Sequence, residues 1–231
     1  MNCTFVNKAT NPMGVLGYFC NFYLSGFVTC VFKHTGRYRV VVSMKLDEVR
    51  EYLSKYLHPY FEHKKYFAEG ELMYKRPTTF GSSVFIATIT GDEEMAYTKF
   101  FIGIRHDLVE TTLTNGFGLK DYFRNSSYTL LLPWSDINSK EIPHALPCRE
   151  YSDVKAAGEW GIKFMDETGF DFLSHYKHLE KLDRIFNDKP ELIAKWTRHN
   201  YLHRFRAMAI AKLLNRPDYD RLFQMHRQYL E

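Results

Sequence analysis

The sequence contains few cysteines, and no two of them are closely spaced. The four stand at positions 3, 20, 30 and 148, without a Cys-x-x-Cys pair or a histidine cluster nearby. A disulfide scaffold needs a denser pattern in a shorter secreted chain, and a structural zinc site needs paired ligands. We therefore expect reduced thiols in a cytoplasmic protein. A bridge between Cys20 and Cys30 stays open, because both lie on segments that can pair as strands.

The chain also lacks the glycine-rich signatures of serine hydrolases and of nucleotide binding. Ser82 and Ser83 follow Gly81 without the Gly-x-Ser-x-Gly elbow that exposes a nucleophile. Gly116 and Gly118 are followed by neither a Gly-Lys-Ser/Thr sequence nor a third spaced glycine. Such glycines are typical of turns, and we expect no cofactor.

A helical metal site is equally incomplete. His199 and His203 have the i, i+4 spacing of zinc ligands, but Asn200 stands where metalloproteases carry their glutamate base. No third ligand is close in sequence. A packed or capping histidine pair explains the spacing, so we expect no metal.

Charge is missing from residues 9–32. This run is long enough to cross a bilayer, but glycine, asparagine and serine interrupt it and no basic segment precedes it. Its apolar residues alternate, since Cys20, Phe22 and Leu24 share one face of an extended chain. The run therefore predicts strands rather than a membrane span.

What the chain does have is the composition of a globular protein rich in rings. Of its 231 residues, 45% are hydrophobic, 25% charged and 16% aromatic, so it can bury a sizeable core. The net charge of +4 is uneven, because residues 195–231 carry eight basic residues against three acidic ones. This excess suits an anionic partner, or a helical surface that complements the rest of the protein.

Hydrophobic patterns in the first part predict an α+β fold. Period-two alternation on either side of a Thr-Gly turn predicts a hairpin over residues 28–44. β-Branched and aromatic content predicts a second hairpin with strands 82–90 and 97–105. The run 127–134 predicts a strand stopped by Pro133. Residues 46–57 have helical spacing that ends at Pro59, and the stretch to Pro77 shows no pattern. We expect an antiparallel sheet within residues 15–134, covered by that helix.

The chain after residue 150 predicts helices only. We divide it into a sheet part (1–137), a proline-containing linker (138–150) and a helical part (151–231), and the two parts are free to pack as one domain. Four helices are predicted within 152–167, 170–187, 189–215 and 217–230. In residues 196–214, apolar stripes on two sides predict an interior helix whose cations pair with nearby acids.

One group of titratable residues stands at a predicted strand end. His106, Asp107 and Glu110 follow the strand 97–105, a position typical of active sites. A hydrolase centred on His106 and Asp107 would need further groups from elsewhere in the chain. The candidates for these groups are Ser82, Tyr122 and Cys148. The simpler interpretation is a capping-box-like helix start at Asp107 and Glu110.

Two segments are candidates for partner binding. Asp92, Glu93 and Glu94 form an acidic hairpin tip, and Arg204 and Arg206 belong to the basic C-terminal region. Since no catalytic motif is complete, the leading interpretation is a non-enzymatic protein-binding module. The alternatives are a nucleic-acid-binding protein that uses the basic helices, and the hydrolase.

Residues 152–192 resemble the late helical part of bacterial polymorphic-toxin immunity-type proteins. The shared pattern is Gly-x-x-Phe-Leu, here Gly169, Phe172 and Leu173, before an amphipathic helix. The resemblance implies a bacterial, cytoplasmic immunity or regulatory protein whose partner is another protein, such as a toxin, with no membrane association and no shared catalytic residues. Immunity proteins that face nucleases tend to be acidic, so the net charge of +4 argues against a nuclease partner.

Overall fold

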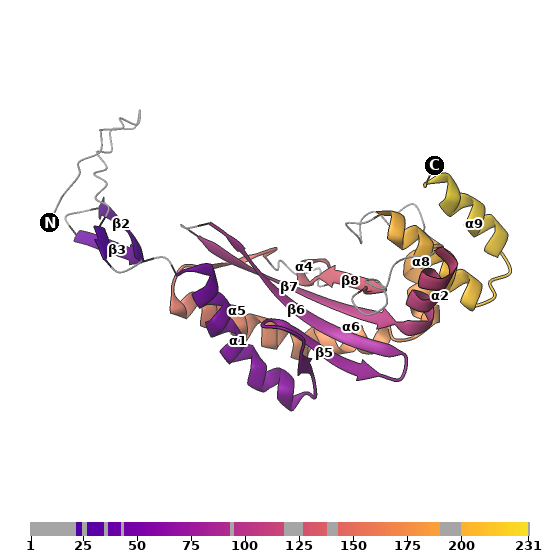
Figure 1. The fold of residues 1–231 in the computed structure, drawn as a ribbon, viewed down its shortest axis with the longest axis horizontal. Helices are drawn as coiled ribbons and strands as arrows, with labels where there is room; N and C mark the ends of the chain where they lie inside the picture. The colour runs from indigo at the N-terminus through magenta and orange to yellow at the C-terminus, as the bar shows by residue number, and fades with distance from the viewer. Residues whose placement is uncertain are drawn as a thin grey trace.

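The computed structural model describes residues 22–24, 27–34, 37–42, 44–92, 95–117, 127–137, 143–189 and 200–230. These residues form an α+β structure, with an antiparallel sheet and with helices concentrated toward the C-terminus (Figure 1). This confirms the fold class predicted from the patterns. No helix among the described residues is long and apolar enough to cross a membrane.

Three N-terminal strands form a small sheet of their own. They are β1 (Phe22–Leu24), β2 (Phe27–His34) and β3 (Arg37–Val42), paired antiparallel with His34 opposite Arg37. This confirms the first predicted hairpin and shows strands within part of the uncharged run. Cys20 lies outside the described residues, so the alternative of a bridge to Cys30 is not tested.

The main sheet is built on one long hairpin. Its strands are β4 (Phe67–Ala68), β5 (Met73–Thr78), β6 (Gly81–Gly91), β7 (Ala96–His106), β8 (Leu130–Pro133) and β9 (Leu146–Cys148). The order is β4-β5-β6-β7-β8, with β9 paired to the start of β7. The β6–β7 pair runs from Gly91 opposite Ala96 to Gly81 opposite His106, which confirms the second predicted hairpin.

Three strands, β4, β5 and β9, lie where the sequence predicted none, and two of them, β5 and β9, contain proline. β5 contains Pro77, but β4 pairs only with Tyr74 and Lys75, so Pro77 lies at the outer edge of the sheet, where proline is tolerated. β9 lies within the expected linker 138–150 and buries Cys148 against β7. Both strands are short and contain proline, so neither shows a clear period in the sequence.

Helix α1 (Leu46–His63) continues past Pro59, so the predicted end at that residue was wrong. Its buried residues recur every fourth position, which keeps one face on the sheet to the last turn. They are Val49, Leu53, Leu57 and Phe61. Pro59 and Lys55 are both exposed. Water can therefore solvate the Lys55 carbonyl, which has no N–H at position 59 to accept from.

A second helical run lies beside α1 on the same face of the sheet (Figure 1). It consists of α5 (Tyr151–Phe164), a π-helical turn η1 (Met165–Gly169) and α6 (Phe170–His175). The core beneath is largely aromatic: Phe61 stacks on Tyr74 with ring centroids 4.4 Å apart, and Phe100 meets Trp134 of the short α4 (Trp134–Ile137) at 5.0 Å. The many aromatic residues of the sequence therefore contribute to the core through packing of one ring against another.

The remaining helices gather where β7 ends (Figure 1). They are α2 (Asp107–Phe117), α7 (Leu179–Asp183), a π-helical turn η2 (Arg184–Asp188), α8 (Asn200–Leu213) and α9 (Tyr219–Gln228). α8 packs against α2, α7, η2 and α9 and is buried along most of its length. This confirms the interior helix predicted within residues 196–214 over the described residues 200–213, whereas residues 196–199 lie outside the description. The helix predicted over 170–187 is interrupted at residues 176–178.

A methyl group at Gly103 of β7 should test the close pairing of β7 with β8. A Cβ there would lie 2.6 Å from the Leu130 carbonyl oxygen, and a backbone atom cannot move away cheaply. Gly103→Ala should therefore lower the free energy of unfolding by about 1–3 kcal/mol in a urea titration. Gly116→Ala is the control and should not be destabilising. A Cβ added at Gly116 would meet nothing within 4 Å, and alanine is favoured over glycine inside a helix. Equal effects of the two changes would contradict the packing described.

Candidate functional site

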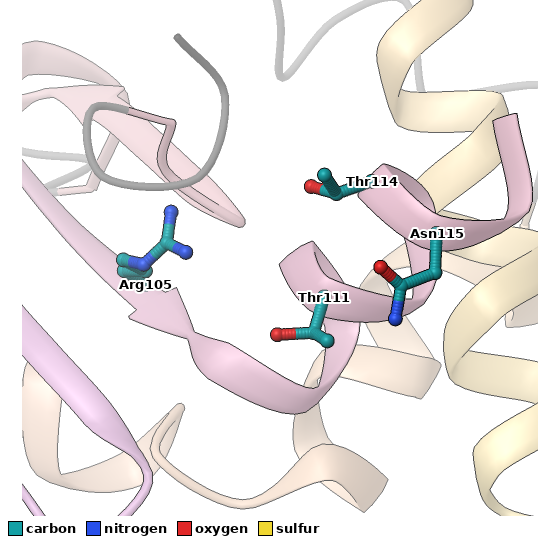
Figure 2. Close-up of a pocket in the computed structure, with 4 residues that line it drawn as sticks. All are labelled: Arg105, Thr111, Thr114 and Asn115. Carbon is teal, nitrogen blue, oxygen red and sulfur yellow. The ribbon is translucent and has the colours of Figure 1, made fainter. Parts of the chain in front are cut away.

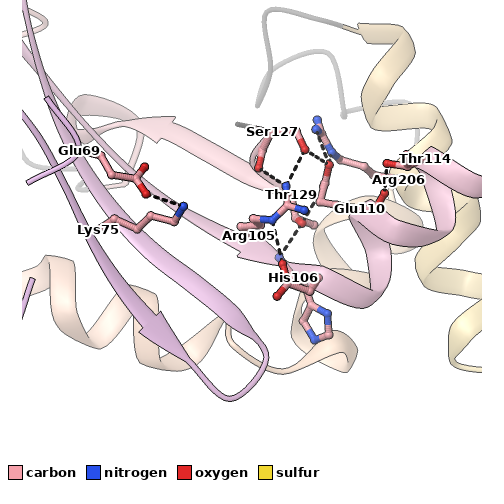
Figure 3. A network of polar contacts seen from close by, with 10 residues as sticks. Glu69, Lys75, Arg105, His106, Glu110, Thr114, Ser127, Thr129 and Arg206 are labelled. Atoms are coloured by element: carbon pink, nitrogen blue, oxygen red, sulfur yellow. Dashed lines mark hydrogen bonds and ion pairs between the residues drawn. The ribbon is translucent and has the colours of Figure 1, made fainter. Parts of the chain in front are cut away.

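A network of buried polar side chains lies where β7 ends and α2 begins. A pocket lies beside this junction (Figure 2), and a polar network runs behind it (Figure 3). The helix does begin at Asp107, as predicted. The three candidate residues of this segment nevertheless point to different surroundings.

Glu110 is at the centre of the network and is 2% exposed. Arg206 of α8 donates to both of its carboxylate oxygens, from Nε to Oε1 at 2.9 Å and from an Nη to Oε2 at 3.2 Å. The hydroxyls of Ser127 and Thr129 donate to Oε2 at 2.6 Å and to Oε1 at 2.8 Å. The carboxylate therefore accepts four hydrogen bonds, from α8 and from the segment leading into β8. It is the centre of a buried ion pair rather than part of a capping box.

The same hydroxyls extend the network to β7 (Figure 3). The His106 backbone N–H donates to the Thr129 hydroxyl at 2.9 Å, and Arg105 donates to the Ser127 carbonyl and hydroxyl at 3.0 and 2.9 Å. Arg105 also donates from Nε to Asp107 at 2.8 Å. Asp107 is thus an exposed partner of an arginine and does not orient the His106 ring.

Burial alone would raise the pKa of Glu110. The Arg206 charge and the hydrogen bonds from Arg206, Ser127 and Thr129 outweigh it and leave the pKa below the ordinary value. Glu110 is therefore ionised at neutral pH, with its oxygens occupied by protein donors. A carboxylate in this state is not available as a general base.

His106 faces away from this network. Its partner across the hairpin is Gly81, so it lies on the helix-covered face of the sheet, where its ring stacks on Phe80 with centroids 5.7 Å apart. It is buried, and burial lowers its pKa, so the imidazole is neutral. His106 is not among the described residues that line the pocket.

The structure does not bring the suggested hydrolase partners to His106. Ser82 pairs with Arg105 and so lies on the opposite face of the sheet. Cys148 pairs with Ala96 at the other end of β7, and burial raises the pKa of its thiol. Tyr122 lies outside the described residues.

The basic residues proposed for partner binding are buried. Arg206 is held by Glu110, and Arg204 lies 3.9 Å from the centre of the Tyr229 ring and 3.3 Å from His226 Nδ1. His226 bonds Asn187 at 2.9 Å, and burial, with the nearby Arg204 charge, lowers its pKa to about 4. These arginines therefore stabilise the helical part, and their placement lends no support to a role on a binding surface.

The other sequence candidates are placed as follows. Asp92 is exposed and accepts from the Met95 N–H at 3.0 Å, while Glu93 and Glu94 lie outside the described residues. His203 is buried and stacks on Phe186 with centroids 5.6 Å apart. His199 also lies outside the description, and the described residues hold no cluster of three or more metal-binding side chains.

One surface was not identified from the sequence, and we call it the tyrosine seam. It consists of Tyr52, Lys55 and Tyr56 of α1 and Tyr151 of α5. Tyr52 and Tyr151 are 40% and 57% exposed and meet edge to face with centroids 4.7 Å apart. Lys55 lies over the Tyr52 ring, and Tyr56 donates to Glu159 at 3.3 Å. Tyr52 and Tyr56 lie within residues 46–57, whose helical spacing predicted a helix covering the sheet and gave no indication of an exposed pair of rings. Tyr151 gave no signal, because its partner lies on another helix.

The fold and the polar centre define an α+β protein with a buried ion pair between α2 and α8. No protein-family model matches the chain, and comparison with curated proteins and with solved structures finds no match. The function must therefore be argued from the surfaces and cavities of the chain itself.

The Glu110–Arg206 pair can be tested by a double-mutant cycle. Glu110→Leu alone leaves the Arg206 charge buried without its counter-ion and should lower the free energy of unfolding by about 3–5 kcal/mol. In an Arg206→Met background the same change should cost much less, because two apolar side chains then face each other. The exposed pair Glu51 and Lys55 is the control and should show little coupling. Equal costs of Glu110→Leu in both backgrounds would rule out the pair as described.

The pair should also make stability depend on pH. Because the folded pKa of Glu110 is lowered, its contribution is complete above the ordinary value of 4.5 and is lost as the pH falls through the lower folded value. The stability of the wild type relative to Glu110→Leu/Arg206→Met should therefore fall between pH 5 and the acid range. Chemical denaturation at a series of pH values measures this, and a pH-independent difference would contradict it.

Proposed function

We propose that the protein is a non-enzymatic protein-binding module and that the tyrosine seam is its contact surface. The observation that carries this proposal is the pair of exposed tyrosines, Tyr52 and Tyr151, in contact across α1 and α5. Exposed aromatic side chains are normal singly, but clustered ones mark recognition surfaces.

The seam has the properties of a binding surface. Tyrosine supplies a large contact area with few rotatable bonds, so little entropy is lost on binding. Tyr52 and Tyr151 already support each other, and the Tyr56 ring packs at Gly158, where a Cβ would come within 2.5 Å of it. The rings are therefore held in place before a partner arrives, which lowers the cost of association.

The charges around the seam suit a protein partner better than a nucleic acid. Lys55 is paired with Glu51, and Lys155 lies 3.8 Å from Glu159. Paired opposite charges give no coherent positive face for phosphates. Such a surface provides a polar rim around an aromatic centre, the usual anatomy of protein interfaces.

The polar centre supports the non-enzymatic part of the proposal. Glu110 is fully engaged by protein donors, and His106 lies on the other face of the sheet from Ser82. The basic-helix alternative loses its two central residues, because Arg204 and Arg206 are buried. The resemblance of residues 152–192 to immunity-type proteins extends the proposal to a bacterial toxin or regulatory partner met in the cytoplasm.

The test uses matched tyrosine variants. Wild-type protein is used as bait in its native cells, and the Kd of the partner found is then measured with purified proteins. Tyr52→Ala/Tyr151→Ala should weaken binding at least tenfold, since each interface tyrosine contributes about 1–2 kcal/mol. Tyr201→Ala, which removes a similarly exposed ring from α8, should leave the Kd unchanged.

Two outcomes would sink the proposal. One is a partner whose Kd is equally affected by Tyr201→Ala and by the seam variant. The other is a purified protein that binds no protein and turns over a small substrate. Circular dichroism of each variant ensures that the fold is intact before binding is compared.

A further inference from the structure

A pocket of about 340 Å³ lies between the end of β7 and α2 (Figure 2). The described residues that line it are Arg105 on one side and Thr111, Thr114 and Asn115 on the other. Its size is at the lower end of the range for small-molecule sites. The pocket lies at the C-terminal end of β7. The tyrosine seam lies toward the other end, because α5 follows β9, and β9 pairs with Ala96 at the start of β7. The pocket is therefore a separate feature from the seam.

The only charged side chain among the described lining residues is a cation held in place. Arg105 donates to Asp107 from Nε and to Ser127 from an Nη, and its side chain is 9% exposed. Because these contacts fix the guanidinium plane, a ligand would not have to restrict it on binding. A buried guanidinium also interacts more strongly with an anion than an exposed one does.

The other lining groups are hydroxyls and an amide. Thr111 and Asn115 are exposed on α2, and the Thr114 hydroxyl donates to the Glu110 carbonyl, which leaves its oxygen as an acceptor. Beside Arg105 on the same sheet face, the buried Ser82 hydroxyl has no protein partner among the described residues. This corner of the fold thus provides more hydrogen-bonding capacity than the described residues use.

We propose that this pocket binds a small, singly charged carboxylate that also carries a hydroxyl. In this proposal the Arg105 guanidinium donates a hydrogen bond to one oxygen of the ligand carboxylate. The side chains of Thr111 and Asn115 form hydrogen bonds with its second oxygen and with the ligand hydroxyl. Asp107 shares the guanidinium at 2.8 Å and neutralises part of its charge. Because Asp107 offsets the Arg105 charge, the second charge of a phosphate dianion has no counter-charge among the described lining residues, and the cost of its desolvation favours a monoanion.

Binding should stabilise the junction of the sheet with α2. Arg105 touches Ser127, which touches Glu110, so a ligand on Arg105 strengthens a network that is lost on unfolding. A ligand that binds only the folded state raises the melting temperature by an amount that grows with the logarithm of ligand concentration above the Kd. This gives a readout that requires no enzymatic activity.

The probes are sodium lactate, sodium acetate and inorganic phosphate, each compared with sodium chloride at equal ionic strength. Lactate should raise the melting temperature progressively with its concentration and bind saturably in isothermal titration, acetate should bind more weakly, and phosphate most weakly. Thr111→Val/Asn115→Leu should weaken lactate binding about tenfold or more, since two hydrogen bonds are removed. Thr112→Val is the matched control, because Thr112 bonds the Leu108 carbonyl and is not among the described lining residues.

Several results would overturn the proposal: no saturable binding of lactate, a tighter Kd for phosphate than for lactate, or an unchanged Kd in Thr111→Val/Asn115→Leu. The seam variant Tyr52→Ala/Tyr151→Ala should bind lactate like the wild type, so failure at the pocket is distinguishable from failure of the protein-binding function.

Discussion

The ion pair between Glu110 and Arg206 is the interaction on which the arrangement of the C-terminal helices depends. The two residues are 96 positions apart, and each is buried in a different helix. Neither charge could be buried alone, because an unpaired ion in the protein interior costs several kcal/mol. α8 is therefore fixed against α2, and Ser127 and Thr129 fix the segment before β8 to the same carboxylate. The sheet and the C-terminal helices thus share one buried polar centre.

Because Glu110 and Arg206 are used internally, the proposed recognition rests on other groups. A fully engaged carboxylate offers nothing to a substrate, whereas the tyrosine seam and the Arg105 pocket present groups to solvent. They lie toward opposite ends of β7, so a macromolecular partner at one and a small ligand at the other need not compete. The network through Arg105, Ser127 and Glu110 links the pocket to the stability of the fold. It provides no described contact with the seam.

Local patterns predicted the elements whose contacts are periodic and continuous. The β6–β7 hairpin was readable because both strands are rich in β-branched and aromatic residues on either side of a polar turn. The interior character of α8 was readable because apolar residues occupy two of its sides. β5, β9 and the last turn of α1 were missed because proline carries a local signal against regular structure. At Pro77 an outer sheet edge overrides that signal, and at Pro59 an exposed helix face does so.

The sequence by itself determined the α+β class, the two hairpins and the presence of a sandwiched basic helix, because each follows from the spacing of side chains along one segment. It also identified His106, Asp107 and Glu110 as an unusual group at a strand end. Only the tertiary structure decided their contacts. The pleat of β7 places the His106 side chain on the helix-covered face, Arg105 donates a hydrogen bond to Asp107, and Arg206 pairs with Glu110. The meeting of Tyr52 with Tyr151 was likewise decided by the packing of α1 on α5. Partners so far apart in sequence leave no local periodicity, since their contact exists only once the intervening chain has folded.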